Sequence, residues 1–417
     1  MMISFLGAMS CVGASGILVE SKGTRLVLDY GTKPRETPPK FPLPVENPTA
    51  VLLSHAHLDH SGALPILTKK YSTPVYSLDI NKELVELLLE DSIKVSREEG
   101  YELPFSSFDV ERTVKNFVDV RYNKKIKIGN FDVTFFDAGH IPGSSMIFLE
   151  SEKTNLLYTG DFNVNSTRLI EGCEKDLPKV KNLIIESTYS DRDHPERVRE
   201  EKEMVRIVDE TVSNGEPVLI AAFAVGRSQE VLLILYSYGI NYPVYLDGMA
   251  KKATTIINKY KNLLRDENSF EEALDFVTFV EPKNRKKLIK QPCVIITTSG
   301  MLNGGPVTYY LKKLHKREKS SLILTGWQIE NTPGRILLET GKFIDGKEEF
   351  EVKMNVNRLD FSAHAGRKEL FNFIEKLNPD KIFCIHGDHT QEFAEELRNK
   401  GFEAFAPIAN NRVFKIE

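Results

Sequence analysis

The stretch Ser54–His60 holds the side chains of this chain that are best suited to bind metal. It reads SHAHLDH and follows the apolar run Ala50–Leu53 directly. A short apolar run of this kind predicts a buried strand, whose end would bring several ligand side chains to one point. Apolar packing does not call for such a concentration of histidine. A polar surface turn is therefore the weaker interpretation, and the stretch predicts a metal site.

Three further strand-like runs end in residues of the same kind. Apolar residues over 118–138, 155–159 and 381–385 precede His140, Asp161 and His386. The candidate ligands are thus His55, His57, Asp59, His60, His140, Asp161 and His386. Imidazole nitrogens with few carboxylates suit zinc or a similar borderline metal. Seven ligands exceed the needs of one tetrahedral ion and fit two ions that share a bridging carboxylate.

A pair of such ions suggests hydrolysis. Two metals about 3.5–4 Å apart activate water at neutral pH and stabilise the charge of a phosphoryl transition state. The predicted reaction is therefore hydrolysis of a phosphodiester, or of a similar ester or amide.

Composition limits the alternatives. A chain of 417 residues is too long for one ordinary core. Its net charge of -4 gives no overall basic field, so a nucleic acid would have to bind at a local patch or groove. The four cysteines form no CxxC pair, and three adjoin apolar runs, which favours buried free thiols and a reducing compartment. No apolar run approaches the roughly 20 residues of a membrane span, and the N-terminus lacks the pattern of a secretory signal. We expect a cytoplasmic protein without a membrane segment.

The pattern of elements changes near residue 190. Before it, strands with tight turns predominate, with helices expected over 61–67 and 80–97. After it, strands and helices alternate, which predicts a parallel sheet covered by helices. The expected strands there are 218–222, 244–247, 277–280, 294–298 and 321–325, and the expected helices are 195–212, 227–238, 250–263, 283–290 and 306–315. From about 344 strand-like alternation returns, followed by helix 367–376, strand 381–385 and helix 390–400.

The order of the motifs resembles a known superfamily. Asp29, the HAHLDH stretch, Gly139-His140 and Gly160-Asp161 look like the metal motifs of the metallo-β-lactamase fold. Glu186 in LIIESTY, His364 in DFSAHA and His386 in CIHGDH resemble motifs A, B and C of its β-CASP branch, and AAFAVGRSQE, TTSGMLNGGP and LTGWQIENTPGR are also similar to that branch. The resemblance covers nearly the whole chain. It is strongest to archaeal relatives of the cleavage-and-polyadenylation nuclease subunit, in a short form without a KH extension, with RNase J as the neighbouring group.

The resemblance implies an α/β fold: a metallo-β-lactamase αββα sandwich with an inserted β-CASP domain, which is a parallel sheet flanked by helices. The implied domains are 1–190 and 346–417 for the sandwich and 191–345 for the insertion. It also implies two zinc ions and a role for each ligand. His55, His57 and His140 would hold one ion, Asp59, His60 and His386 the other, and Asp161 would bridge them, while Asp29 would orient a ligand histidine.

Two further residues receive catalytic roles from the resemblance. His364 would stabilise the scissile phosphate or protonate the leaving oxygen, and Glu186 would be its partner. A carboxylate beside an imidazolium stabilises its charge, which suits a general acid. Taken alone, Glu186 could be a solvated acid at a strand end and His364 a residue at a helix entry, but the motif order favours the catalytic interpretation.

Candidate substrate contacts follow in the second part of the chain. Backbone amides at Ser299, Gly300 and Met301, before an expected helix, could bind an RNA phosphate, although a plain tight turn explains the glycines as well. Arg227 and Arg335 are further candidates for phosphate contacts. Trp327 could stack on a base, but packing after a buried strand is the favoured interpretation.

The resulting hypothesis is an RNA phosphodiesterase that acts as an endonuclease, a 5′–3′ exonuclease, or both, in RNA processing or decay. A histidine at motif C, here His386, goes with RNA-directed members of the branch, which disfavours the alternative of a DNA-directed nuclease. A catalytically silent RNA-binding subunit is a second alternative, and a small-molecule thioester or lactam hydrolase is a third. The resemblance also implies a homodimer and partners among RNA-processing or decay factors.

Overall fold

The computed structural model describes residues 1–33, 36–346, 348–410 and 412–416. Two compact units emerge from the contacts among them. Unit 1 comprises Met1–Ser166, Gly172–Asp193 and Ala363–Glu417, and unit 2 comprises Thr167–Glu171 and His194–Ser362. Unit 1 is thus built from both ends of the chain, and the middle of the chain forms unit 2.

The first sheet of unit 1 contains the N-terminal strands and the last strand of the chain. Its order is β22-β1-β2-β3-β4-β5-β6. The strands are β1 (Met2–Phe5), β2 (Gly16–Ser21), β3 (Thr24–Tyr30), β4 (Ala50–Leu52), β5 (Val75–Leu78), β6 (Phe117–Val120) and β22 (Val413–Lys415). Strands β3 to β6 run parallel. Parallel strands end at the same edge of a sheet, so Asp29 at the end of β3 and the stretch Ser54–His60 after β4 emerge together.

The second sheet of unit 1 has the order β21-β20-β11-β10-β9-β8-β7. Its strands are β7 (Ile126–Ile128), β8 (Phe131–Asp137), β9 (Ser145–Glu150), β10 (Asn155–Tyr158), β11 (Asn182–Glu186), β20 (Lys381–Ile385) and β21 (Ala404–Phe405). β10, β11 and β20 are parallel neighbours. β8 has the same direction, because it is antiparallel to β9 and β9 is antiparallel to β10. His140, Asp161, Glu186 and His386 therefore all lie at or just beyond the same edge of this sheet.

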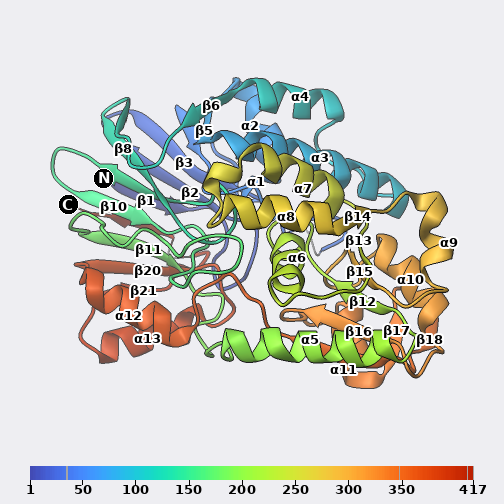
Figure 1. The fold of residues 1–417 in the computed structure, drawn as a ribbon. Coiled ribbons are helices and arrows are strands. Elements are labelled where there is room, and N and C mark those ends of the chain that lie inside the picture. Colours follow the sequence, from blue (N-terminus) through green and yellow to red (C-terminus); the bar gives the residue numbers. More distant parts are fainter. Residues whose placement is uncertain (34–35, 347, 411, 417) are drawn as a thin grey trace. The chain divides into compact units, whose positions relative to one another are not determined.

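Helices cover the outer faces of the two sheets of unit 1 (Figure 1). They are α2 (Leu64–Tyr71), α3 (Asp79–Glu99) and α4 (Ser107–Lys115) beside the first sheet, and α12 (Arg367–Leu377) and α13 (Thr390–Asn399) beside the second. The short helix α1 (Leu58–Ser61) follows β4 and carries Asp59 and His60. Aromatic rings fill the space between the sheets: Phe383 of β20 contacts Phe5 of β1, Phe414 of β22 and Phe405 of β21. This arrangement is the expected αββα sandwich.

Unit 2 is built on a parallel sheet with the order β14-β13-β15-β12-β16-β19. Its strands are β12 (Val218–Ala221), β13 (Val244–Leu246), β14 (Val277–Phe279), β15 (Val294–Thr297), β16 (Ser321–Thr325) and β19 (Asn355–Leu359), with a separate hairpin of β17 (Lys342–Ile344) and β18 (Glu349–Glu351). Its helices are α5 (Arg197–Ser213), α6 (Arg227–Ser237), α7 (Ala250–Lys259), α8 (Glu267–Phe276), α9 (Arg285–Leu288), α10 (Pro306–Leu314) and α11 (Pro333–Thr340), with short 3₁₀ turns at Lys261–Leu263 and Pro282–Asn284. The expected parallel sheet flanked by helices is confirmed.

Several short elements were not anticipated from the sequence, among them β5, α4, α8 and α11. Local capping accounts for two of them. The Asp109 carboxylate accepts from the backbone N–H of Ser106 at 2.9 Å at the start of α4, and Asp266 accepts from the N–H of Ser269 at 3.0 Å at the start of α8. In both cases the sequence shows two polar residues three positions apart at the start of the helix.

The end of unit 2 also differs from the boundary suggested at 345. β19 lies beyond that position, yet it pairs with β16 along its whole length, from Ser321–Asn355 to Thr325–Leu359. Backbone pairing thus holds residues up to Ser362 in unit 2. Cys173, Cys293 and Cys384 are buried free thiols, as expected. No helix in the described ranges is long and apolar enough to cross a bilayer.

Candidate metal centre

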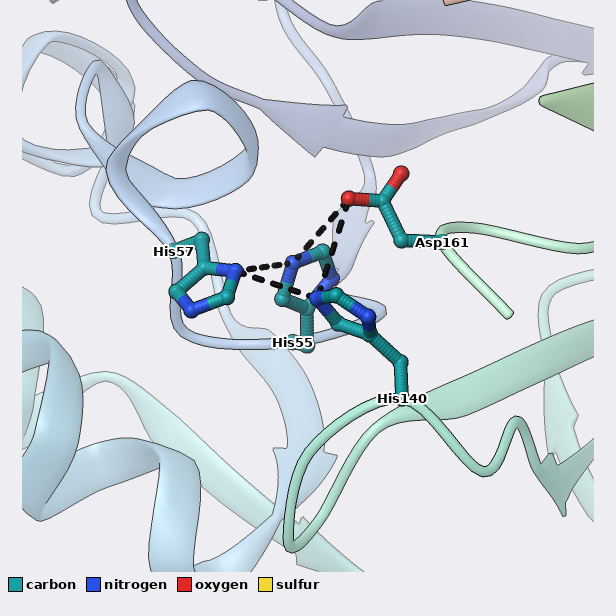
Figure 2. A group of neighbouring side chains, drawn as sticks. All are labelled: His55, His57, His140 and Asp161. Carbon is teal, nitrogen blue, oxygen red and sulfur yellow. Dashed lines mark hydrogen bonds and ion pairs between the residues drawn. The ribbon is translucent and has the colours of Figure 1, made fainter. Parts of the chain in front are cut away.

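Three histidines and an aspartate of unit 1 converge on one point (Figure 2). Nδ1 of His57 lies 3.2 Å from Nε2 of His55 and 3.2 Å from Nε2 of His140. Oδ2 of Asp161 lies 3.7 Å from Nε2 of His55 and 3.9 Å from Nε2 of His140. Each residue offers one ligand atom, and these atoms all lie within 4.8 Å of one another. The four atoms form a group of the size and chemistry that a zinc ion requires.

A second group adjoins the first and shares Asp161 with it. Oδ1 of Asp161 lies 3.3 Å from Nε2 of His60 and 3.4 Å from Nδ1 of His386. Nε2 of His386 lies 3.4 Å from Oδ2 of Asp59. The ligand atoms of this group also lie within 4.8 Å of one another. The two oxygens of Asp161 thus face different groups, which is the geometry of a bridging carboxylate.

Unsatisfied buried atoms support a metal at these positions. Nε2 of His60, Oδ1 of Asp161 and Nε2 of His386 are buried and have no hydrogen-bond partner among the described residues. Buried polar atoms are nearly always satisfied, because an unpaired one loses its hydration without compensation. Coordination to a cation would satisfy all three. The donor set, rich in imidazole with two carboxylates, fits zinc.

The pKa values of the three histidines in the first group favour neutral rings, which can bind a metal. Burial, reinforced by neighbouring imidazoles, lowers the pKa of His55 and of His140 well below the ordinary range. Burial also lowers the pKa of His57. Because protonation is disfavoured, these rings keep the lone pair that a metal needs.

The second group has a strongly negative environment. Burial opposes protonation of His60, but the carboxylates of Asp161 and Asp29 outweigh it and raise the pKa of His60 well above the ordinary range. Burial opposes ionisation of Asp59, but the adjacent imidazole of His386 outweighs it and holds the pKa of Asp59 below its usual value. An environment that favours positive charge on an imidazole would also favour a bound cation.

Asp29 lies behind the second group and fixes the ring of His60. Its Oδ2 lies 2.7 Å from Nδ1 of His60 and accepts from the Tyr158 hydroxyl at 2.7 Å. The same carboxylate accepts from the N–H of Ser54 at 2.7 Å and from its hydroxyl at 2.6 Å. With Nδ1 engaged in this way, Nε2 of His60 is directed at Asp161. A carboxylate behind a histidine fixes the tautomer and the orientation that metal binding requires.

The loop that carries the histidines passes very close to the end of β3. A Cβ at Gly31 would lie 1.8 Å from the carbonyl oxygen of Asp59, so only glycine leaves room for the loop there. The backbone N–H of Ser15 also donates to this carbonyl, at 2.9 Å. The position of the loop is therefore set by the backbone of the strands beside it.

Glu186 and His364 lie beside the first group. Nδ1 of His364 is 2.9 Å from Oε2 of Glu186, and the ring centroids of His364 and His140 are 4.5 Å apart. Burial opposes protonation of His364, but Glu186 and Asp161 outweigh it and raise the pKa of His364 to about 9. Glu186 is held in turn by the backbone N–H of Phe162, which donates at 2.8 Å. The carboxylate of Glu186 thus favours a protonated His364 ring next to the ligand groups.

Sequence reasoning missed the residues that support the ligands. Tyr158 and the hydroxyl of Ser54 hold Asp29, and the carbonyl oxygen of Ala363 lies 2.8 Å from Nδ1 of His140. Thr188 donates to the carbonyl oxygen of His386 at 3.1 Å. Ser54 and Ala363 could have been suspected, because each adjoins a motif residue. Tyr158 could not, since nothing in the sequence shows that its hydroxyl reaches β3.

The five candidate substrate contacts all belong to unit 2. Ser299, Gly300 and Met301 follow β15; the Met301 side chain is buried, and its carbonyl accepts from Gly334 at 3.0 Å. The guanidinium of Arg227 donates to the carbonyl of Thr325 at the end of β16. Arg335 on α11 pairs with Glu339, one turn further along the helix. Because its side chain is buried, Met301 could contact a substrate only through its backbone atoms.

Comparisons with known families account for most of the chain. Residues 10–212 match the metallo-beta-lactamase superfamily and residues 228–337 match the Beta-Casp domain. Residues 349–407 match the Zn-dependent metallo-hydrolase RNA specificity domain. The three matches follow one another in the order that the motifs predict.

Curated relatives extend over nearly the full length. A probable RNase MJ4 from Methanocaldococcus jannaschii is 38% identical over 99% of this chain and 100% of its own length. RNase aCSPSF2 from Saccharolobus solfataricus is 36% identical over 97% of this chain and 83% of its own. A transcription termination factor FttA from M. jannaschii is 37% identical over 95% of this chain and 68% of its own.

Proposed function

The chain belongs to the metallo-β-lactamase superfamily, in the β-CASP ribonuclease family of zinc-dependent hydrolases, and from this membership we propose that it hydrolyses RNA phosphodiester bonds with two zinc ions. It would act as a 5′–3′ exonuclease, an endonuclease, or both, in RNA processing or decay. One observation carries the proposal: the carboxylate of Asp161 faces two adjacent groups of ligands, one oxygen to each. The match to an RNA specificity domain and the names of two relatives as RNases support RNA as the substrate.

The two ligand groups divide between the ions. His55, His57 and His140 would hold one ion, and Asp59, His60 and His386 the other, with Asp161 between them. Zinc bound there would supply Lewis-acid activation of water and stabilise the charge that develops on the phosphate. Asp29 would keep His60 in the tautomer that binds metal through Nε2.

His364 is proposed as the general acid. With Nδ1 engaged by Glu186, the proton on Nε2 is the one that can reach a leaving oxygen. A pKa of about 9 keeps the ring protonated at neutral pH until the leaving oxygen gains charge. Glu186 would act through His364 by holding its ring and stabilising its positive charge.

Cleavage of end-labelled RNA and matched DNA by the zinc-loaded chain tests this function. We expect the RNA to be cut, and we expect Asp59→Ala and His386→Ala to abolish cutting while the circular dichroism spectrum is retained. Equal or faster cutting of DNA would favour a DNA-directed nuclease instead. Comparing 5′-monophosphate, 5′-triphosphate and circular RNA then separates exonuclease from endonuclease action, because a circular substrate has no end.

Metal analysis tests the two-ion arrangement separately. Wild-type protein should hold about two zinc ions per chain, and His57→Ala and Asp59→Ala should each remove about one. Asp161→Ala should reduce both. Protein without zinc that still binds RNA would favour a catalytically silent RNA-binding subunit.

Family membership also motivates expectations about the assembly. We propose a homodimer that acts in the cytoplasm with other RNA-processing or decay factors. Light scattering on the purified chain tests the first part, and a monomer at working concentration would contradict it.

A further inference from the structure

One indole in unit 2 contacts two arginines. The guanidinium of Arg335 is 5.5 Å from the ring centroid of Trp327, and that of Arg358 is 5.2 Å away. The three residues come from different places: Trp327 follows β16, Arg335 lies in the first turn of α11, and Arg358 is near the end of β19. Parallel pairing of β16 with β19 sets Leu324 opposite Arg358, which brings Arg358 to the strand end that Trp327 follows.

Arg358 differs in its ionic partners from most other arginines of unit 2. Six arginines there pair with carboxylates, namely Arg168, Arg197, Arg206, Arg265, Arg285 and Arg317. Arg358 is exposed and has no ion pair among the described residues. Arg335 gives its Nε to Glu339, and the structure shows no further ion pair in the described residues for its two terminal nitrogens.

At Arg358 the indole takes the place that a carboxylate partner has at other arginines of unit 2, and it does not neutralise the charge. A cation over an aromatic face is held by the ring quadrupole, an attraction of about 0.5–1 kcal/mol at exposed sites. A carboxylate would neutralise the guanidinium and occupy its donors. Arg358 therefore keeps its donors and its positive charge for an anion, and Arg335 keeps its two terminal nitrogens beside the Nε that pairs with Glu339. Planar guanidinium forks match phosphate oxygens.

The surrounding edge of the sheet has other features suited to a nucleic-acid chain. β12 is the parallel neighbour of β16, and Phe223, just beyond β12, is 40% exposed. Gly300 lies against the backbone that leads into Phe223, since a Cβ there would be 3.1 Å from the Phe223 nitrogen. Gln328, next to Trp327, donates to the carbonyl of Gly300 at 3.1 Å. Exposed aromatic rings and positive charge at one edge are typical of single-strand binding surfaces.

We propose that Trp327, Arg335 and Arg358 form a phosphate-binding cluster for the single-stranded RNA backbone, with Trp327 as the positioning residue that holds the two arginines. The inference rests on the proposed function, because it assigns part of the recognition of the RNA substrate to unit 2. It adds Arg358 and Trp327 to the candidate RNA-binding residues, and it identifies the Trp327 ring as the group that holds Arg335. Backbone contacts of this kind carry no sequence information, so the cluster binds RNA regardless of its bases.

Equilibrium binding of a labelled single-stranded RNA tests the cluster. The zinc-loaded full chain carries His364→Ala, so that bound RNA is not cut. Adding R335Q and R358Q together should raise Kd about tenfold at moderate salt. Each phosphate contact on a single strand contributes roughly 0.7 to the slope of log K against log salt, so the slope should fall by about 1.4. A Kd within twofold of the parent and an unchanged salt slope would overturn the proposal.

Trp327 variants separate positioning from packing. W327L keeps both arginines but loses the ring, and should raise Kd and lower the salt slope in the same direction as the double variant. W327F keeps an aromatic face and should restore much of the binding. If W327L binds RNA with the parental salt slope, the ring only packs and its positioning role fails. Circular dichroism confirms that each variant is folded.

A matched control and a cleavage assay complete the design. R206Q removes an exposed arginine of α5 that is paired with Glu203 and Glu210, and it should leave RNA binding unchanged. Loss of binding in R206Q equal to that of R335Q/R358Q would mean that any lost positive charge suffices, which also overturns the proposal.

If the wild-type chain cuts no RNA, the proposed function fails. If it cuts RNA and R335Q/R358Q binds RNA as well as the parent, only this inference fails.

Discussion

Nδ1 of His364 lies within hydrogen-bonding distance of both oxygens of Glu186, at 3.1 Å from Oε1 and 2.9 Å from Oε2. The carboxylate is 1% exposed, so water cannot screen its effect on the ring. A buried carboxylate beside an imidazole favours the protonated ring. The protonation of His364 therefore depends on Glu186, although the two residues are 178 positions apart in the chain.

Glu186→Gln should slow RNA cleavage strongly. The amide keeps the shape and can still accept from Phe162, but it no longer stabilises an imidazolium at His364. General acid catalysis contributes about a hundredfold or more, so kcat should fall by about that factor while zinc content stays the same. Single-turnover cleavage measures the change. Glu375→Gln, which alters a surface pair with Lys400, is the control, and a kcat of Glu186→Gln within twofold of wild type would refute the role.

Asp29→Asn should weaken zinc binding without removing a ligand. The change leaves His60 without the carboxylate that fixes its ring. Loss of such a partner typically lowers metal affinity by about 10–100-fold. Competition with a zinc chelator measures the affinity. Tyr158→Phe removes only one of the hydrogen bonds to Asp29 and should have a smaller effect. Unchanged zinc affinity in Asp29→Asn would contradict the orienting role.

Asp360 should contribute to the stability of unit 2 in a pH-dependent way. Burial opposes ionisation of Asp360, but the hydrogen bond from His194 outweighs it and lowers the pKa of Asp360 to about 2. A carboxyl with a depressed folded-state pKa stabilises the fold above its unfolded pKa, and the contribution is lost as pH falls through the folded value. The contribution should reach about 2 kcal/mol at neutral pH and disappear between about pH 4 and pH 2.

Fluorescence of the single tryptophan, Trp327, reports unfolding of unit 2 directly. Denaturant titrations of Asp360→Asn and wild type should differ in free energy of unfolding at pH 7 and converge as the pH approaches 2. A constant difference across that range would show that charge on Asp360 is not the cause.

Phe383→Ala should destabilise unit 1. The side chain is fully buried, and its ring centroid lies 4.9 Å from that of Phe414 and 5.6 Å from that of Phe5. Truncating a buried phenylalanine costs about 3–5 kcal/mol, because the cavity adds to the lost burial. Circular dichroism during denaturant unfolding measures the loss. Phe108→Ala, at a ring that is 71% exposed, should change the stability by less than about 0.5 kcal/mol.

The ligands themselves could be predicted because they follow recognisable strands. His55, Asp161 and His386 each follow a short apolar run by a few residues. Parallel pairing was predicted only for the sheet of unit 2, where strands and helices alternate. A set of imidazoles and carboxylates at strand ends therefore implied a metal site before any distance was known.

Tertiary structure alone decided how the ligands are shared and supported. Only the packing of the two sheets shows that the oxygens of Asp161 face different groups. The hydroxyl of Tyr158 reaches Asp29 across 129 positions of sequence. Contacts between residues that far apart leave no periodic pattern in the sequence, so no local pattern could reveal them.

The same limit applies to unit 2. Sequence patterns identified Arg335, favoured packing over base stacking for Trp327, and assigned residue 358 to the other domain. Pairing of β19 with β16 placed Arg358 beside the indole. The amino-acid sequence thus determined the chemical types available and the strands that carry them. Strand pairing and sheet packing decided which of those groups meet, because register and sheet order depend on many weak contacts between distant residues.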